Sequence, residues 1–136
     1  MTDRELCNLA VAAMDKAYAP YSGYKVGAAL LSASGRVYCG CNIENAAYSP
    51  TNCAERTAFF KAVSEGERSF VKIAVCGGKD GRITAPFMPC GVCRQVMAEF
   101  CEDTFEIIVL SDGEKMEKYT LGKLFYGKFS PDNISL

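Results

Sequence analysis

Eight cysteines and no histidine limit the chemistry open to this chain of 136 residues. Cys90 and Cys93 form a C-x-x-C unit, and Cys53 stands two positions before Glu55. On a helix, residues three apart share a face, so the two sulfurs of the unit can hold one metal ion or form a redox pair. Without histidine, neither histidine metal ligands nor histidine general bases are available. The pattern therefore indicates metal or redox chemistry carried by cysteine.

Both cysteine motifs are predicted to lie at the starts of helices. The residue pattern favours helices over 52–64 and 91–100, each entered from a strand or a loop. In an α/β fold such helix starts gather at the C-terminal edge of the strands. We therefore expect Cys53 to meet Cys90 and Cys93, where the positive ends of the helix dipoles favour thiolate, the form that binds metal.

Three converging thiolates suit zinc, and a zinc ion with three protein ligands keeps one position open for water. Zinc lowers the pKa of such a water, and Glu55 is placed to take its proton without being a ligand. Arg56 could donate hydrogen bonds to the thiolates and draw negative charge away from them. Two other interpretations stay open at this point. One is a closed structural zinc site with Cys76 as fourth ligand, and the other is a C-x-x-C thiol oxidoreductase.

Composition argues for an ordinary globular chain that does not bind nucleic acid. Lys plus Arg number 15 and Asp plus Glu number 16, and the formal charge of −1 disfavours a protein that neutralises many phosphates. Apolar stretches fall far short of the roughly 20 residues of a membrane span. The N-terminal ten residues contain no apolar signal core, so we expect a cytoplasmic protein whose cysteines are thiols.

The remaining elements predict a three-layer α/β/α fold around a five-stranded mixed sheet, built as one domain over residues 1–136. Near-continuous apolar strands indicate a sheet that is covered on both faces. The expected helices outside the cysteine motifs are 3–18 and 121–126, and the expected strands are 26–31, 36–43, 71–76, 105–110 and 116–120, with a loop at 77–89.

The two cysteine motifs, read with their neighbours, resemble the zinc-dependent cytidine deaminase family. Cys-Ala-Glu-Arg-Thr-Ala at 53–58 and Pro-Cys-Gly-Val-Cys-Arg-Gln-Val at 89–96 carry the resemblance. It extends over nearly the whole chain and is closest to the short, homotetrameric class that acts on free nucleosides. Further family-like segments are 19–22, 26–30, 40–48, 61–66 and 129–131.

The resemblance implies a role for each matching residue. Cys53, Cys90 and Cys93 would bind one zinc ion per subunit, and Glu55 would shuttle protons. Asn42 and Glu44 would hydrogen-bond the ribose hydroxyls. Tyr24, where the family usually has Phe, would pack on the pyrimidine, and the backbone of Ala54 would contact the base. Phe129 would insert into a neighbouring subunit's site, with Tyr48 at that shared boundary.

The implied reaction is hydrolytic deamination of cytidine and deoxycytidine to uridine and deoxyuridine, with release of ammonia, in pyrimidine salvage. The partners would be the nucleoside, water and three further copies of the chain. Deamination of a modified cytosine nucleoside and editing of a polynucleotide are rival readings, and the formal charge of −1 disfavours the second. A zinc-stabilised structural module and a thiol oxidoreductase remain rivals of a different class.

Overall fold

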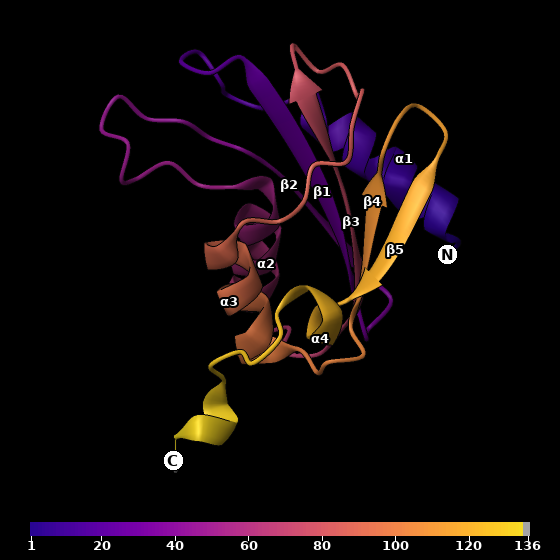
Figure 1. The fold of residues 1–136 in the computed structure, drawn as a ribbon, viewed down its shortest axis with the longest axis vertical. Helices are drawn as coiled ribbons and strands as arrows, with labels where there is room; N and C mark the ends of the chain where they lie inside the picture. The colour runs from indigo at the N-terminus through magenta and orange to yellow at the C-terminus, as the bar shows by residue number, and fades with distance from the viewer. Residues whose placement is uncertain (135–136) are drawn as a thin grey trace.

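A five-stranded mixed sheet forms the centre of the computed structural model, which describes residues 1–134 (Figure 1). The last two residues of the predicted 1–136 domain lie outside the described residues. In sheet order the strands are β2 (Val37–Cys41), β1 (Tyr24–Ser32), β3 (Phe70–Lys79), β4 (Glu106–Leu110) and β5 (Met116–Thr120). Strand β3 pairs with β4 in parallel, whereas the pairs β1–β2, β1–β3 and β4–β5 are antiparallel. Consequently β2, β3 and β4 run in the same direction and end at the same edge.

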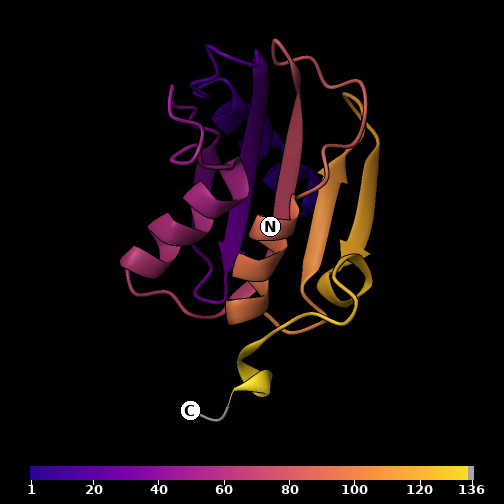
Figure 2. The same ribbon diagram turned by 60° about the vertical axis from the view of Figure 1, so that its left-hand side comes forward.

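Helices cover both faces of the sheet, which confirms the predicted three-layer fold (Figure 2). Helix α1 (Asp3–Met14) packs on one face through Leu6, Ala10 and Met14. Helices α2 (Ala54–Ser64) and α3 (Gly91–Phe100) pack on the other, together with the short α4 (Leu121–Leu124). A 3-10 turn at Pro131–Asn133 follows, and the bounds of α3 are those predicted from the sequence.

Helix α1 begins as its sequence predicts but ends four residues early. Thr2 and Glu5 form a reciprocal capping box at its start. The predicted end at Tyr18 is wrong because this residue joins the loop after β2. The Tyr18 N–H donates to the Asn42 carbonyl at 3.0 Å, and the Glu44 N–H donates to the Tyr18 carbonyl at 2.8 Å. A tertiary pairing therefore replaces the last helical turn.

Strand β3 is longer than predicted, because residues 77–79 belong to it and not to the following loop. Gly77 and Gly78 lie in the strand where close approach leaves no room for a side chain. A Cβ on Gly78 would stand 1.8 Å from the Arg82 carbonyl oxygen. The glycines thus allow the chain to fold back tightly at the edge where the cysteine motifs lie.

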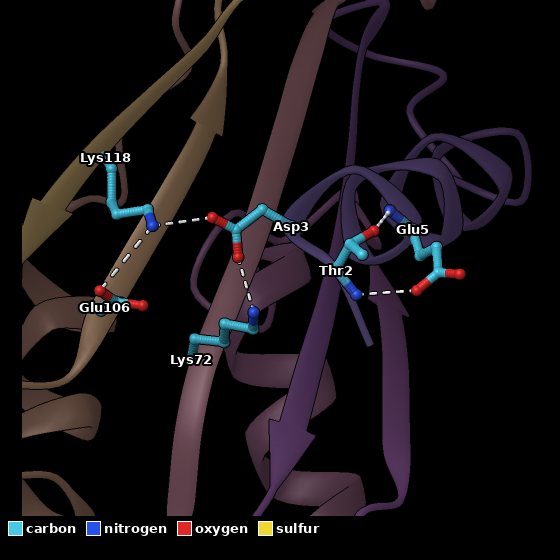
Figure 3. Close-up of polar contacts among 6 residues, drawn as sticks. All are labelled: Thr2, Asp3, Glu5, Lys72, Glu106 and Lys118. Atoms are coloured by element: carbon cyan, nitrogen blue, oxygen red, sulfur yellow. Dashed lines mark hydrogen bonds and ion pairs between the residues drawn. The ribbon is translucent and has the colours of Figure 1, made fainter.

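A charged cluster fixes the N-terminus of α1 to the sheet (Figure 3). The Asp3 carboxylate accepts from Lys72 Nζ of β3 at 2.6 Å and pairs with Lys118 Nζ of β5 at 2.8 Å. Lys118 also lies 3.9 Å from Glu106 of β4. One carboxylate in the first turn of α1 therefore contacts two strands and also complements the helix dipole.

None of the helices within residues 1–134 has the length and the apolar composition required to cross a membrane.

Candidate metal centre

Cys53, Cys90 and Cys93 occupy the starts of two neighbouring helices. Cys53 is the N-cap residue of α2 and Cys90 the N-cap residue of α3, and neither side chain caps its helix. Cys93 lies in the first turn of α3. The two helices lie side by side on one face of the sheet, and each follows a strand that ends at the shared edge (Figures 1 and 2). The predicted helix start at residue 52 is shifted by two, because Asn52 pairs with Ile43.

The three sulfurs converge as the spacing predicts. They all lie within 4.8 Å of one another, and Cys53 Sγ is 3.7 Å from Cys90 Sγ. In a tetrahedral zinc site with Zn–S bonds of about 2.3 Å, the sulfurs stand about 3.8 Å apart. Among residues 1–134 no fourth cysteine or carboxylate joins the cluster. The donor set therefore fits a zinc ion with three protein ligands and one open position.

Cys76, the candidate for a fourth structural ligand, lies on the wrong face of the sheet. It is fully buried in the apolar cluster beneath α1, and burial raises the pKa of its thiol to about 12. The thiols of the metal cluster instead lie on the α2 and α3 side. The structure thus excludes the closed four-cysteine site built with Cys76.

Hydrogen bonds polarise the thiol cluster. A hydrogen bond from Cys93, together with donation from the Arg56 guanidinium at 3.3 Å, lowers the pKa of the Cys53 thiol well below its ordinary value. The same bond to Cys53, together with burial, raises the pKa of Cys93. Arg56 therefore lies where it can offset thiolate charge. Arg94, the other nearby cation, donates to the Pro89 carbonyl at 2.8 Å and shapes the turn before Cys90.

Glu55 lies next to the thiol cluster but outside it. Its side chain is only 4% exposed, and burial raises the pKa of its carboxyl group to about 7. It lines a cavity of about 210 Å³ together with Cys53 and Cys90. A carboxyl group that gains and loses a proton near neutral pH is suited to proton transfer.

The same cavity is walled by Tyr24, Phe87 and Asn42. The Tyr24 and Phe87 rings stack with their centroids 5.9 Å apart. The Asn42 amide accepts from the Val26 N–H at 2.8 Å and donates to the Tyr24 carbonyl at 2.7 Å. An aromatic wall facing a buried amide and a buried carboxyl can take a flat, polar ring.

Glu44 lines a second cavity of about 330 Å³, which adjoins the first through Ser22 and Thr51. Its carboxylate accepts from the Tyr21 N–H at 2.9 Å and the Ser22 N–H at 3.1 Å. A further hydrogen bond from the Ser22 hydroxyl lowers the pKa of Glu44. Tyr48, which is 82% exposed, lines this outer cavity too.

The remaining predicted residues are placed differently. Ala54 is fully buried and lines the inner cavity. Phe129 is 56% exposed and lines neither cavity, and its carbonyl accepts from the Gln95 amide at 2.9 Å. The structure therefore brings all the other predicted site residues to the two cavities or to the thiol cluster, and leaves Phe129 outside them.

The sequence analysis did not identify Phe87 as part of the site. This residue lies in the glycine- and proline-rich segment that precedes Cys90, where no periodicity marks an element. The available signal is an aromatic residue three positions before Cys90. Ser22, Thr51 and Met88, which also line the inner cavity, carry no such signal.

Comparison with known proteins agrees with this geometry. The family profile described as "Cytidine and deoxycytidylate deaminase zinc-binding region" matches residues 1–109. The cytidine deaminase of Sporosarcina psychrophila is 52% identical over 123 residues, which are 90% of this chain and 88% of that protein. The cytidine deaminase of Halalkalibacterium halodurans is 45% identical over 134 residues, 98% of each chain.

A solved structure shows the same architecture. The crystal structure of cytidine deaminase from Burkholderia pseudomallei matches with a TM-score of 0.88 and 45% identity, covering 95% of this chain and 100% of that one. Sequence, fold and thiol cluster thus lead to one assignment: the chain belongs to the cytidine and deoxycytidylate deaminase family.

Proposed function

We propose that this protein is a zinc-dependent cytidine deaminase that converts cytidine and deoxycytidine to uridine and deoxyuridine, releases ammonia and serves pyrimidine salvage. One observation carries the proposal: a buried carboxyl group, Glu55, lines a small cavity beside three converging thiols. The relatives named cytidine deaminase support the choice of substrate.

Cys53, Cys90 and Cys93 would hold the zinc, and Arg56 would offset the excess negative charge of three thiolates. When bound, zinc supplies a Lewis acid that makes a water molecule acidic near neutral pH. Glu55 performs the proton transfers. It accepts one proton from the attacking water and passes it to ring nitrogen N3 while the water oxygen bonds to C4. It then takes the proton of the C4 hydroxyl so formed and gives it to the amino group, so that the C4–N bond breaks, ammonia leaves and the C4 carbonyl of the product forms. One carboxyl group thereby acts as base and then as acid.

The rest of the inner cavity holds the nucleoside. Tyr24 and Phe87 pack against the pyrimidine, and the backbone of Ala54 contacts its polar edge. The Asn42 amide has one donor hydrogen and one lone pair beyond its two bonds to β1, and these are available to a ribose hydroxyl. Glu44 faces the outer cavity and accepts from the other hydroxyl.

We further propose that the chain acts as one domain over residues 1–136 in a cytoplasmic homotetramer. The exposed Phe129 ring lines neither cavity of its own chain, which supports its insertion into a neighbour's site. Tyr48, exposed at the rim of the outer cavity, would lie at the same boundary.

The proposal is tested by following the ultraviolet absorbance of cytidine incubated with the purified protein. We expect rapid conversion to uridine, and we expect Glu55→Gln to lower kcat by at least about 10²-fold, the contribution of a positioned proton-transfer group. The zinc content per chain of Glu55→Gln should equal that of the wild type. A wild-type protein that contains zinc and leaves cytidine unchanged would refute the proposed substrate. A nearly unchanged rate in Glu55→Gln would refute the proton-transfer role.

A further inference from the structure

Lys79, the last residue of β3, contacts two parts of the cavity mouth at once. Its ammonium group donates to the Ser22 carbonyl at 2.7 Å. The same nitrogen lies 5.3 Å from the centroid of the Tyr24 ring, a cation–π distance. Tyr24 and Lys79 are opposite one another in the β1–β3 register, so the sheet itself sets this pairing.

The backbone around Gly23 is shaped to admit this ammonium group. Gly23 has φ = 74°, which few residues other than glycine adopt. A Cβ at this position would stand 2.8 Å from Lys79 Nζ. Asp80, which follows Lys79 directly, donates its N–H to the Gly23 carbonyl at 2.7 Å. Two successive residues at the end of β3 therefore hold the turn at 21–23.

Both contacts of Lys79 connect it to protein groups that are proposed to bind the nucleoside. Tyr24 lines the inner cavity but is 45% exposed, and its stacked partner Phe87 comes from the long segment between β3 and α3. Ser22 in turn donates from its N–H and its hydroxyl to Glu44. Lys79 is thus linked directly to the pyrimidine wall and, through one residue, to the ribose carboxylate.

We propose that Lys79 is a positioning residue, which fixes the Tyr24 ring and the 21–23 turn in the geometry that binds the nucleoside. This inference rests on the proposed function. Lys79 lines neither cavity and does not touch the thiols or Glu55, so its effect falls on binding and not on proton transfer. Cytidine is neutral near pH 7, so loss of one positive charge does not alter long-range attraction of the substrate.

The test is the kinetics of Lys79→Met, which keeps an unbranched apolar stem and removes the ammonium group. We expect KM for cytidine to rise about three- to tenfold while kcat stays within about twofold, as for loss of an exposed cation–π contact and one hydrogen bond. Lys79→Arg retains a cation and a donor, and it should keep KM near the wild-type value. Lys123→Met, an equal charge change at an exposed position of α4, is the matched control and should leave both constants unchanged.

A double-mutant cycle with Tyr24→Leu separates positioning from a general structural effect. If Lys79 acts through the aromatic ring, Lys79→Met should raise KM much less in the Tyr24→Leu background than in the wild type. The inference is overturned when an active wild type and Lys79→Met share the same KM, when kcat falls as much as KM rises, or when the two substitutions are simply additive. Lack of cytidine conversion by the wild type overturns the proposed function instead.

Discussion

Two cysteines of this chain, Cys93 and Cys76, have nearly the same burial but different surroundings. Cys93 and Cys76 are 1% and 0% exposed, yet only Cys93 has two further sulfurs within 4.8 Å. Cys76 packs among apolar side chains beneath α1. Burial alone therefore does not distinguish a metal ligand from a small apolar residue, whereas the neighbouring donors do.

This contrast gives a prediction with a built-in control. Cys93→Ala should lower the zinc content from about one ion per chain to near zero, because two thiolates do not complete the site. Cys76→Ala removes a sulfur of the same burial and should retain full zinc content. Zinc per chain, measured by atomic emission after dialysis, decides the outcome. Equal losses in both variants would mean that metal binding follows general stability and not ligation.

Some parts of the site could be predicted from the sequence, and others could not. The three thiols follow from their positions at two helix starts, because helix geometry fixes where those side chains lie. The surroundings of Glu44 do not follow, since its partners at Tyr21 and Ser22 come from a turn without periodicity. Phe87 was missed for the same reason. Residue spacing determines where side chains lie within one helix, whereas the contacts of loops depend on the tertiary fold.

Helix α2 packs against β2 so closely that no side chain fits at Gly40. A Cβ on Gly40 of β2 would stand 2.5 Å from the Ala54 carbonyl oxygen and 2.6 Å from the Ala58 nitrogen. These are backbone atoms of α2, so a side chain at Gly40 cannot be accommodated by rotation of its neighbours. The position of Cys53 and Glu55 relative to the sheet therefore depends on glycine, which has no side chain, at position 40.

We predict that Gly40→Ala destabilises the protein by about 1–3 kcal/mol, the range for overpacking in a tight interior. The matched control is Gly113→Ala, because an added Cβ there meets nothing within 4 Å. The control should change the free energy of unfolding by less than about 0.5 kcal/mol. Urea unfolding of both variants measures the difference, and a Gly40→Ala variant as stable as the control would contradict the close packing of α2.

The attachment of α1 to the sheet should depend on pH through Asp3. Hydrogen bonds from Lys118 and Lys72 hold the pKa of this carboxyl group below its ordinary value. A group with a lowered pKa in the folded state stabilises the fold above its unfolded pKa of about 3.9, and this stabilisation is lost as pH falls through the folded pKa. Asp3→Asn should therefore cost about 1 kcal/mol near neutral pH and progressively less below about pH 4.

The control for Asp3 is Glu99→Gln, since Glu99 is exposed on α3 and forms no ion pair within residues 1–134. Its free energy of unfolding should stay within a few tenths of a kcal/mol of the wild type. A cost of Asp3→Asn that is the same at pH 3 and pH 7 would show that the ion pairs contribute nothing.

The limits of sequence reasoning are clearest where tertiary pairing overrides local preference. Helical periodicity predicted α1 up to Tyr18, but Tyr18 pairs with the loop after β2. Glycines predicted that β3 ends before Gly77, but pairing with β1 extends it to Lys79. In α3 the local pattern and the packing agree, and there the prediction was correct. Local signals therefore fail where contacts with a distant segment set the end of an element.

At the level of the whole molecule, the proposed assembly makes each site depend on two chains. Phe129→Ala alone should raise KM for cytidine by about tenfold through loss of an aromatic contact. When Phe129→Ala and Glu55→Gln chains are unfolded and refolded together, about a quarter of the mixed sites should hold both intact residues. At cytidine concentrations far below KM, activity should therefore rise above that of either variant refolded alone.

Subunit mixing has a clear negative result. If Phe129 served its own chain, every site in the mixture would lack one residue or the other, and activity would equal the mean of the separate variants. Tyr126→Ala removes an aromatic side chain that is 95% exposed and close in sequence, and it should leave KM unchanged.

The two helix starts that hold the thiols lie far apart in the chain, since Cys53 and Cys90 are separated by 37 positions in sequence. An ion bound at both helix starts closes the segment between them into a loop, so the free energy of metal binding contributes to the free energy of folding. Each tenfold rise in free zinc above the dissociation constant adds about 1.4 kcal/mol to the stability of the folded state. The melting temperature of this protein therefore rises with the concentration of free zinc, and scarcity of the metal lowers the stability of the folded chain together with its turnover.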